Sequence, residues 1–266
     1  MNINLCKNLQ KVFEIYSFTD YHHIDMLPKF LKYITIMFNI SKEQLYGSHI
    51  FDSQKNVRTP AEEKSDFRRM MKKRLAEYEK DFLKVRKDAE SAYLMFTESQ
   101  LYRDSRTILA FMAMGCEMDT RAVIQKALSD GKRVAVPRII PGDDCQMDFY
   151  FLSATESLEK QLEKSDWGIF EPKETLEKLD SGKLPILSLL LVPGLAFSRS
   201  GARLGRGKGY YDRYIEKLYA QKSMIHLPVA LVGWGFEMQV FDEVPIDDHD
   251  AMLTHLVTEK GIILCE

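Results

Sequence analysis

The residues between Gly201 and Arg213 have the types and the spacing that anion binding requires. Their order is Gly-Ala-Arg-Leu-Gly-Arg-Gly-Lys-Gly-Tyr-Tyr-Asp-Arg, in which Arg206 and Lys208 alternate with glycines. Glycines let the backbone approach a phosphate closely, while the flanking cations neutralise its charge. A buried strand before the run and a helix after it would add a helix N-terminus to the same site. The sequence therefore predicts a phosphate-binding loop, and composition alone leaves a solvated surface loop as the alternative.

Neither of the two common phosphate-binding patterns describes this loop. Lys208 is followed by Gly209 rather than by Ser or Thr, which excludes a Walker A loop, and the residue three places after Gly209 is Asp212, which excludes G-x-G-x-x-G. Asp212 itself has two interpretations. It is either a magnesium ligand beside the phosphates or a carboxylate that stabilises the N-terminus of the following helix.

A longer stretch around the loop resembles the signature of the 5-formyltetrahydrofolate cyclo-ligase family, also called 5,10-methenyltetrahydrofolate synthetases. The matching residues are Pro193-Gly194-x-Ala196-Phe197 and then Gly201-x-Arg203-Leu204-Gly205-x-Gly207-x-Gly209-Tyr210-Tyr211-Asp212-Arg213. Weaker matches extend from Lys64 to the C-terminus; they are Lys64-x-x-x-Arg68, Glu117, Trp167-Gly168-Ile169 before Glu171-Pro172, and Pro245-Ile246-Asp247. The family often has an acidic residue at the position of Ser198, and the first 60 or so residues have no counterpart in a minimal enzyme of this kind.

The resemblance implies an ATP- and Mg²⁺-dependent C–N ligase. Such enzymes convert 5-formyltetrahydrofolate into 5,10-methenyltetrahydrofolate and release ADP and phosphate. The formyl oxygen is a poor leaving group, so its phosphorylation makes the carbon open to attack by N10, and loss of phosphate closes the ring. Phosphoryl transfer of this kind needs positioned cations, backbone donors and a metal more than it needs a nucleophile.

The same resemblance assigns roles to residues. The ATP site comprises Lys64, Arg68, Arg203, Leu204, Gly205, Arg206, Gly207, Lys208, Gly209, Tyr210 and Tyr211. The residues predicted to act in catalysis are Arg206, Lys208 and Tyr211. The folate is expected to contact Met112, Glu117, Trp167 and Tyr211, with Glu117 accepting hydrogen bonds from the pterin. Asp212 and Asp250 are the expected metal ligands.

Each of these residues also has a structural interpretation. Lys64 and Arg68 would otherwise lie on a solvated helix face, and Asp250 would belong to a solvated acidic turn. Met112 and Trp167 would be core residues, and Glu117, after an apolar strand, would face solvent.

The elements that must position these residues alternate between strand-like and helix-like patterns, as in βαβ units. A long charged helix is expected from Ala61, with an apolar stripe formed by Phe67, Met70, Met71, Leu75, Tyr78, Phe82 and Val85. The expected strands are 107–114, 133–137, 147–152 at an edge, 184–192 at the centre, 228–233, 256–258 and 262–264. The expected helices are 120–128, ended by Gly131, and 210–221. The fold class predicted for residues 61–266 is therefore a three-layer α/β/α domain, with a mainly parallel open sheet and helices on both faces. Residues 1–60 are expected to form a small helical N-terminal extension of unknown role.

Composition excludes several other classes of protein. Hydrophobic residues make up 45% and charged residues 29% of the 266 residues, which argues against a disordered chain or a fibre. A net charge of −2 gives no general reason to expect a nucleic-acid partner. The four cysteines form no C-x-x-C pair, and no apolar window reaches the ~18 residues of a membrane span. We expect a cytoplasmic protein without a membrane partner, either a monomer or a weak homo-oligomer.

Two other functions remain open on the sequence. One is a different ATP-dependent reaction of the same scaffold on another small carbonyl or amide substrate. The other is a catalytically silent regulator that keeps the fold and binds a nucleotide or RNA. RNA binding through one basic patch would be strongly salt-dependent and would tolerate Glu117→Ala.

Overall fold

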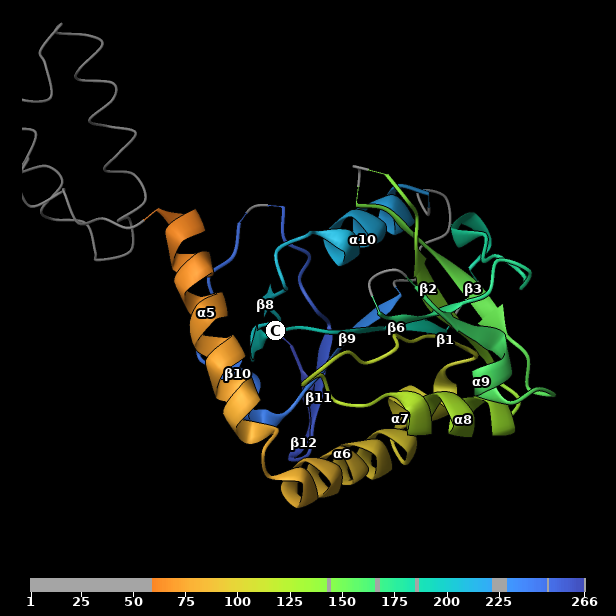
Figure 1. Cartoon of the computed structure of the whole chain (residues 1–266), viewed down its shortest axis with the longest axis horizontal. Coiled ribbons are helices and arrows are strands. Elements are labelled where there is room, and N and C mark those ends of the chain that lie inside the picture. Colours follow the sequence, from red (N-terminus) through yellow and green to blue (C-terminus); the bar gives the residue numbers. More distant parts are fainter. Residues whose placement is uncertain are drawn as a thin grey trace, which may run out of the picture. The chain divides into compact units, whose positions relative to one another are not determined.

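The structure is a computed structural model of the chain, and it describes residues 59–142, 145–165, 168–184, 187–221, 229–247 and 249–265. The chain divides into two compact units, Met1–Arg58 and Thr59–Glu266, and the second unit is the one described below (Figure 1). Nearly all of the expected N-terminal extension therefore lies outside the described residues. Trp167, a predicted folate contact, lies outside them as well.

The second unit is built on a seven-stranded sheet in the order β12-β11-β9-β6-β1-β2-β3. The five strands from β11 to β2 are parallel, and the strands at both edges, β12 and β3, pair antiparallel with their neighbours. In chain order the strands are β1 (Thr107–Leu109), β2 (Arg133–Ile139), β3 (Met147–Leu152), β6 (Ser188–Val192), β9 (Ala230–Trp234), β11 (His255–Thr258) and β12 (Gly261–Leu264).

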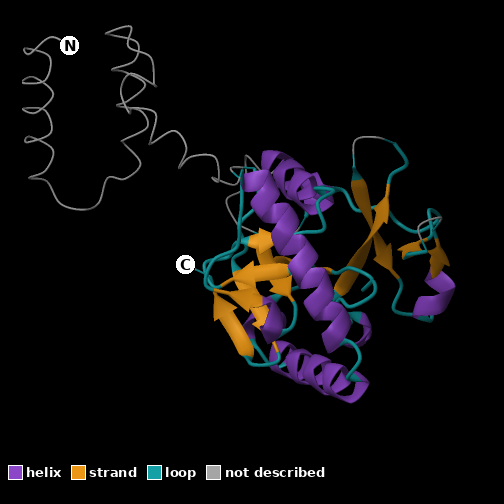
Figure 2. Ribbon diagram, turned by 60° about the vertical axis from the view of Figure 1, so that its left-hand side comes forward, coloured by secondary structure: helices purple, strands orange, loops and turns teal. Residues whose placement is uncertain are grey.

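Side chains on both faces of this sheet are buried, because helices cover each face. The central strand β6 is apolar in four of its five residues: Leu189 and Leu191 pack on one face, and Leu190 and Val192 on the other. The first face is covered by α5 (Pro60–Tyr78), α6 (Phe82–Thr97), α7 (Gln100–Asp104) and α8 (Arg121–Ser129). The second is covered by α10 (Tyr210–Gln221), and Figures 1 and 2 show helices on both sides of the strands. The three-layer α/β/α prediction is confirmed.

The prediction of one long helix from Ala61 is wrong, because the charged segment forms two helices. α5 begins with a capping box in which the Thr59 side chain accepts from the Glu62 backbone, and it ends at Tyr78. α6 starts anew, with the Asp81 carboxylate accepting from the backbone N–H of Lys84. The expected stripe mixes two environments as a result, since Leu75 is buried whereas 70% of Phe82 is exposed.

Other elements differ from their predicted bounds mainly at the ends. Strand β1 stops at Leu109 rather than at residue 114, and the chain then leaves the sheet. Strand β6 begins at Ser188 rather than at residue 184. The predicted helix 120–128 corresponds to α8, and Gly131 follows it with a φ of +75°, as expected of a residue that ends a helix.

Two small sheets complete the unit. β7 (Ala196–Ser198), β8 (Arg203–Leu204) and β10 (Val240–Phe241) form a three-stranded sheet, and β4 (Leu162–Lys164) pairs with β5 (Phe170–Pro172). The remaining helical turns are α9 (Leu158–Gln161), η3 (Ser181–Lys183) and η4 (Glu237–Gln239). Within the described part of the chain, no helix is both long enough and apolar enough to cross a membrane.

Candidate active site

A cavity of about 480 Å³ lies beyond the carboxyl ends of the central strands, where open α/β sheets usually bind ligands. Its wall includes every described residue that the sequence analysis assigned to ATP, folate or metal. These residues are Lys64, Arg68, Met112, Glu117, Arg203, Leu204, Gly205, Arg206, Gly207, Lys208, Gly209, Tyr210, Tyr211, Asp212 and Asp250. Met112 is both buried in the core and part of this wall, so its two interpretations are compatible.

The glycine-rich run is divided between three structural elements rather than forming one loop. Gly201 lies in the turn between β7 and β8, and a Cβ there would lie 2.4 Å from the carbonyl oxygen of Leu253. Arg203 and Leu204 form β8 and are buried. Only residues 205–209 form the loop that leads into α10, and Gly207 and Gly209 have positive φ angles there. The expectation that Gly201 serves the phosphate loop is therefore wrong; close packing against residue 253 requires this glycine.

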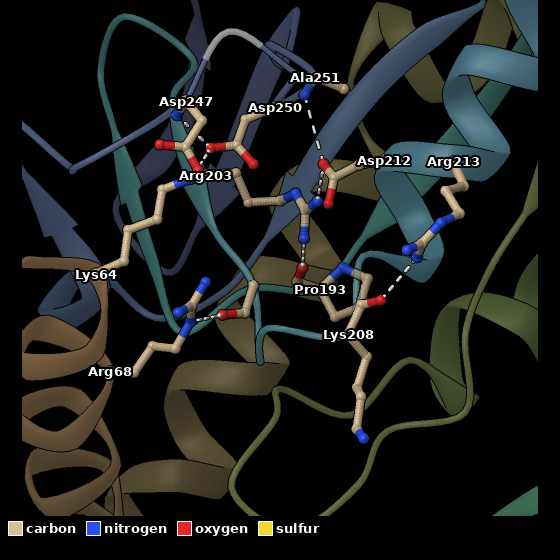
Figure 3. A network of polar contacts seen from close by, with 11 residues as sticks. Lys64, Arg68, Pro193, Arg203, Lys208, Asp212, Arg213, Asp247, Asp250 and Ala251 are labelled. Atoms are coloured by element: carbon tan, nitrogen blue, oxygen red, sulfur yellow. Dashed lines mark hydrogen bonds and ion pairs between the residues drawn. The ribbon is translucent and has the colours of Figure 1, made fainter. Parts of the chain in front are cut away.

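Arg203 connects β8 to the first turn of α10 (Figure 3). Its Nη2 donates to Oδ1 of Asp212 at 2.6 Å, and its Nη1 donates to the carbonyl oxygen of Pro193 at 3.2 Å. Only 5% of Arg203 is exposed. A Cβ on Gly205 would come within 2.8 Å of Nη1, so the glycine leaves room for the guanidinium. Asp212 thus has a third role, as the partner of a buried arginine.

Helix α5 brings two cations to the cavity from one face, since Lys64 and Arg68 are one turn apart. Lys64 is 5% exposed and donates to Oδ2 of Asp247 at 2.6 Å and also to Oδ2 of Asp250. Burial opposes the charged amine, but the hydrogen bonds and charges of these two carboxylates outweigh it and raise the pKa of Lys64. Arg68 donates from Nε to the Gly205 carbonyl oxygen at 3.0 Å. Neither residue belongs to a solvated helix face.

Glu117 and Arg206 form an ion pair between the turn after β1 and the glycine loop. Arg206 Nε donates to Oε1 of Glu117 at 2.9 Å, and Arg206 Nη2 donates to the Met114 carbonyl oxygen at 3.2 Å. The backbone N–H of Met114 donates to the other carboxylate oxygen, Oε2, at 3.0 Å. Only 10% of the Glu117 side chain is exposed, so this residue does not face solvent.

Lys208 and Tyr211 occupy different environments in the same wall. In Figure 3 the Lys208 side chain points away from Arg203 and Asp212, and its carbonyl oxygen accepts from Arg213 at 2.8 Å. Among the described residues, neither Lys208 nor Arg68 forms an ion pair. Burial, reinforced by the charge of Glu117 and opposed by Arg203, raises the pKa of the Tyr211 hydroxyl far above its usual range. Tyr211 is therefore neutral and can donate or accept a hydrogen bond.

Two acidic residues of the wall were absent from the residues predicted for the site. Asp247 pairs with Lys64, and Glu171 is a 4% exposed residue of β5. Both lie in segments that resemble the family, but the neighbouring residues in the sequence do not predict that either side chain lines the cavity. The wall residues of β2 and β3, and those just before Glu171 in the chain, are apolar or aromatic; they are Pro137, Ile139, Met147, Ile169 and Phe170.

Asp212 and Asp250 offer oxygen ligands of the kind that Mg²⁺ prefers. One oxygen of each carboxylate already forms an ion pair, Asp212 with Arg203 and Asp250 with Lys64. Among the described residues no cluster of three or more His, Cys, Asp or Glu could hold a metal by itself. Mg²⁺ usually takes one or two carboxylates together with phosphate oxygens and water, so the residues fit an ion that arrives with a nucleotide.

Comparison with known sequences identifies the family of this chain. The sequence model of the 5-formyltetrahydrofolate cyclo-ligase family matches residues 60–259. The 5-formyltetrahydrofolate cyclo-ligase of Mus musculus is 31% identical over 160 residues, which are 60% of this chain and 76% of the mouse protein. A probable 5-formyltetrahydrofolate cyclo-ligase of Caenorhabditis elegans is 29% identical over 203 residues, which are 76% of this chain and 96% of the nematode protein.

Solved structures show the same architecture. The 5,10-methenyltetrahydrofolate synthetase of Aquifex aeolicus superimposes with a TM-score of 0.59 and 26% identity, over 76% of this chain and 93% of the other. The corresponding synthetase of Mycoplasma pneumoniae gives a TM-score of 0.52 at 17% identity, over 74% and 98%, which is a likeness of fold alone. The family match covers most of the described unit, and the described residues that the resemblance assigned to ATP, folate or metal line one cavity. The chain belongs to the 5-formyltetrahydrofolate cyclo-ligase family.

Proposed function

We propose that this protein converts 5-formyltetrahydrofolate into 5,10-methenyltetrahydrofolate, with hydrolysis of ATP to ADP and phosphate. The observation that carries the proposal is that the described residues predicted to bind ATP, folate or metal line one cavity. Cations from α5 and from the glycine loop lie in the same wall as Met112 and Glu117, which follow β1. A nucleotide and a folate can therefore be held side by side.

The reaction joins two bond changes at one formyl group. The formyl oxygen attacks the γ-phosphorus of ATP, and ADP leaves. N10 then attacks the activated carbon, the C–O bond breaks, and phosphate departs while N10 loses its proton. Both changes develop negative charge on oxygen, so positioned cations lower the barrier more than a protein nucleophile would.

Lys208 and Arg68 are the cations best placed to hold the transferring phosphate. Since neither pairs with a described carboxylate, no local ion pair has to be broken when an anion arrives. The backbone N–H groups of residues 205–209 and the N-terminus of α10 add donors at the same place. Arg206 can also bind the phosphate, but its guanidinium is already hydrogen-bonded to the Glu117 carboxylate.

Asp212 and Asp250 would hold Mg²⁺ through the oxygens that do not receive Arg203 or Lys64. When bound, the ion supplies charge neutralisation between the phosphates. Arg203 and Lys64 then act as supports that keep the two carboxylates at fixed positions. The neutral Tyr211 is suited to border the folate and to donate a hydrogen bond to a developing oxyanion.

The direct test supplies 5-formyltetrahydrofolate, ATP and Mg²⁺ and follows the near-ultraviolet absorbance of the methenyl product. We expect product only when all three are present. Well-folded protein that gives none would rule out the cyclo-ligase activity.

Lys208→Ala tests the phosphate site. We expect turnover to fall by about two orders of magnitude or more, since loss of one preorganised charge contact has effects of this size. Lys72→Ala is the matched control, because Lys72 is an exposed lysine of α5 that does not line the cavity. Equal turnover in the two variants would mean that the transferring phosphate lies elsewhere.

A further inference from the structure

Glu171 is a buried carboxylate in the cavity wall that the roles assigned above do not use. It lies in the middle of β5, is 4% exposed, and borders the cavity. Its carboxylate accepts from the backbone N–H of Ile139 in β2, and Met147 of β3 lines the same cavity. A carboxylate at this position would repel a phosphate, so it does not belong to the nucleotide part of the cavity.

The Glu171 carboxylate accepts fewer hydrogen bonds than its two oxygens allow. Its Oε1 accepts one long bond, 3.3 Å, from the backbone N–H of Ile139, and its Oε2 accepts none from any residue in the described ranges. The nearby guanidinium of Arg138 is turned to other groups. It contacts the Glu163 carboxylate at 2.6 Å, the Pro172 carbonyl oxygen at 2.9 Å and the Glu174 carboxylate at 3.2 Å.

The other carboxylate of the cavity that faces the folate side differs in this respect. Both oxygens of Glu117 accept hydrogen bonds, from Arg206 and from Met114. A buried carboxylate without a full set of donors is unfavourable by itself, and a ligand that brings N–H groups removes the penalty. Of these two carboxylates, Glu171 therefore has more to gain from a donor-bearing ligand.

The neighbours of Glu171 indicate the shape of that ligand. Ile139, which donates its N–H to Glu171, pairs across the sheet with Met147, and both line the cavity with Pro137. Phe170 precedes Glu171 in β5 and also lines the cavity. A flat ring with apolar faces and a polar N–H edge would satisfy both features. Folates have such an edge, because the 2-amino group and the adjacent ring N–H are parallel donors that match the two oxygens of a carboxylate.

We propose that Glu171 is a specificity-determining residue that accepts hydrogen bonds from the N–H edge of the substrate's 2-aminopyrimidinone ring. The inference rests on the proposed function and adds a residue role to it. Binding of this edge would fix the rotation of the pterin in the cavity. The formyl group at N5 would then be held toward the glycine loop.

The test is equilibrium binding of 5-formyltetrahydrofolate to the full chain by calorimetry, without ATP. In Glu171→Gln the side-chain amide still offers an oxygen to Ile139 but places an N–H₂ group against the donor edge. We expect folate affinity to fall about 10- to 100-fold, the range for a lost charge-assisted hydrogen bond. ATP affinity should remain that of the wild type. Glu174→Gln is the matched control, since Glu174 lies close by in the sequence, is largely exposed, and does not line the cavity.

A folate analogue in which hydrogen replaces the 2-amino group identifies the contact. Wild-type protein should bind the analogue about 10- to 100-fold more weakly than the natural folate. Glu171→Gln should bind the two folates with similar affinity, and Glu117→Gln should still discriminate between them. Coupling of the 2-amino group to Glu117 alone would overturn the proposal.

The measurements on the wild-type protein are sufficient by themselves to overturn the proposal. Equal affinity of the wild type for folate and analogue would overturn it, whatever the variants do. Failure of the proposed function has a different outcome, namely no methenyl product from wild-type protein supplied with ATP and Mg²⁺. Near-wild-type folate binding by a folded Glu171→Gln variant would remove Glu171 from the site while leaving the cyclo-ligase activity untouched.

Discussion

At the phosphate end of the cavity, Arg203 holds one metal-ligand candidate in place. It lies almost wholly inside the protein, and two of its nitrogens bind Asp212 and the Pro193 carbonyl. Removing one partner of a buried ion pair leaves the other charge without compensation. We expect Arg203→Met to lower the free energy of unfolding by about 3 kcal/mol, measured by urea denaturation.

Arg213→Met is the control for this substitution. Arg213 also carries a guanidinium bound to a carbonyl oxygen, that of Lys208, but it is exposed and its removal leaves no buried charge. The loss of stability should be clearly smaller than for Arg203→Met. Equal losses would show that the pair with Asp212 is not what stabilises this part of the fold.

Glu171 gives a second prediction, on pH. Burial raises the pKa of its carboxyl group, while the Ile139 N–H and Arg138 oppose the shift less strongly. The folded state therefore retains a proton that the unfolded chain has lost, and this contribution to stability is lost as the pH rises through the raised pKa. Glu171→Gln does not ionise. Its free energy of unfolding relative to the wild type should be more favourable at about pH 7 than at about pH 4. A difference that is the same at both pH values would contradict this.

At the residue scale, the sequence predicts which residues line the cavity but not which residues they contact. Lys64, Arg68 and Glu117 come from distant segments, and only the family resemblance joins them to the glycine loop. Their partners are set by tertiary packing: Lys64 with two aspartates, Arg68 with a loop carbonyl, Glu117 with Arg206. No spacing rule encodes contacts between residues 89 or more positions apart.

At the scale of elements, the loop of residues 205–209 depends on its backbone conformation. Gly207 has a φ of +100°, and a Cβ there would lie 3.4 Å from the Arg68 guanidinium. Gly131 has a φ of +75°, with open space where its Cβ would be. Both Gly→Ala variants should lose about 1–2 kcal/mol of stability through backbone strain. Only Gly207→Ala should also lose turnover, because its loop lines the cavity, and parallel unfolding and activity measurements separate the two effects.

Helices and strands with a clear hydrophobic periodicity were predicted with nearly the correct bounds, whereas the breaks between neighbouring elements were not predicted. The edge strand β3 and helix α10 have the bounds that the pattern gives. The break between α5 and α6 was missed because charged residues continue through it, and only the cap at Asp81 marks a new start. The β7–β8 hairpin was merged with the loop because its glycine, Gly201, resembles those that follow. In both cases the chain changes direction where the types of residue do not change, so the sequence pattern does not reveal the turn.

At the scale of the whole molecule, opposite charges are nearly balanced inside the cavity. Its wall contains five basic residues, Lys64, Arg68, Arg203, Arg206 and Lys208, and five acidic ones, Glu117, Glu171, Asp212, Asp247 and Asp250. Three of the basic residues are paired with carboxylates. We therefore expect a nucleotide to be attracted by Arg68 and Lys208, which pair with no described carboxylate, rather than by a general positive field; this fits the net charge of −2.

The division of the chain into two units leads to the last prediction. The family match begins at residue 60, the second unit begins at Thr59, and every described residue of the cavity follows it. A chain that starts at Thr59 should therefore keep the kcat/KM of the full chain for folate and for ATP. Thr59 must be retained, because its capping box starts α5, and Thr59→Ala in the shortened chain should weaken ATP binding by loosening the turn before Lys64. If the shortened chain folds, as judged by circular dichroism, and loses turnover by a factor of about ten or more, residues 1–58 take part in the reaction. Unchanged kinetics would limit their role to something other than this chemistry.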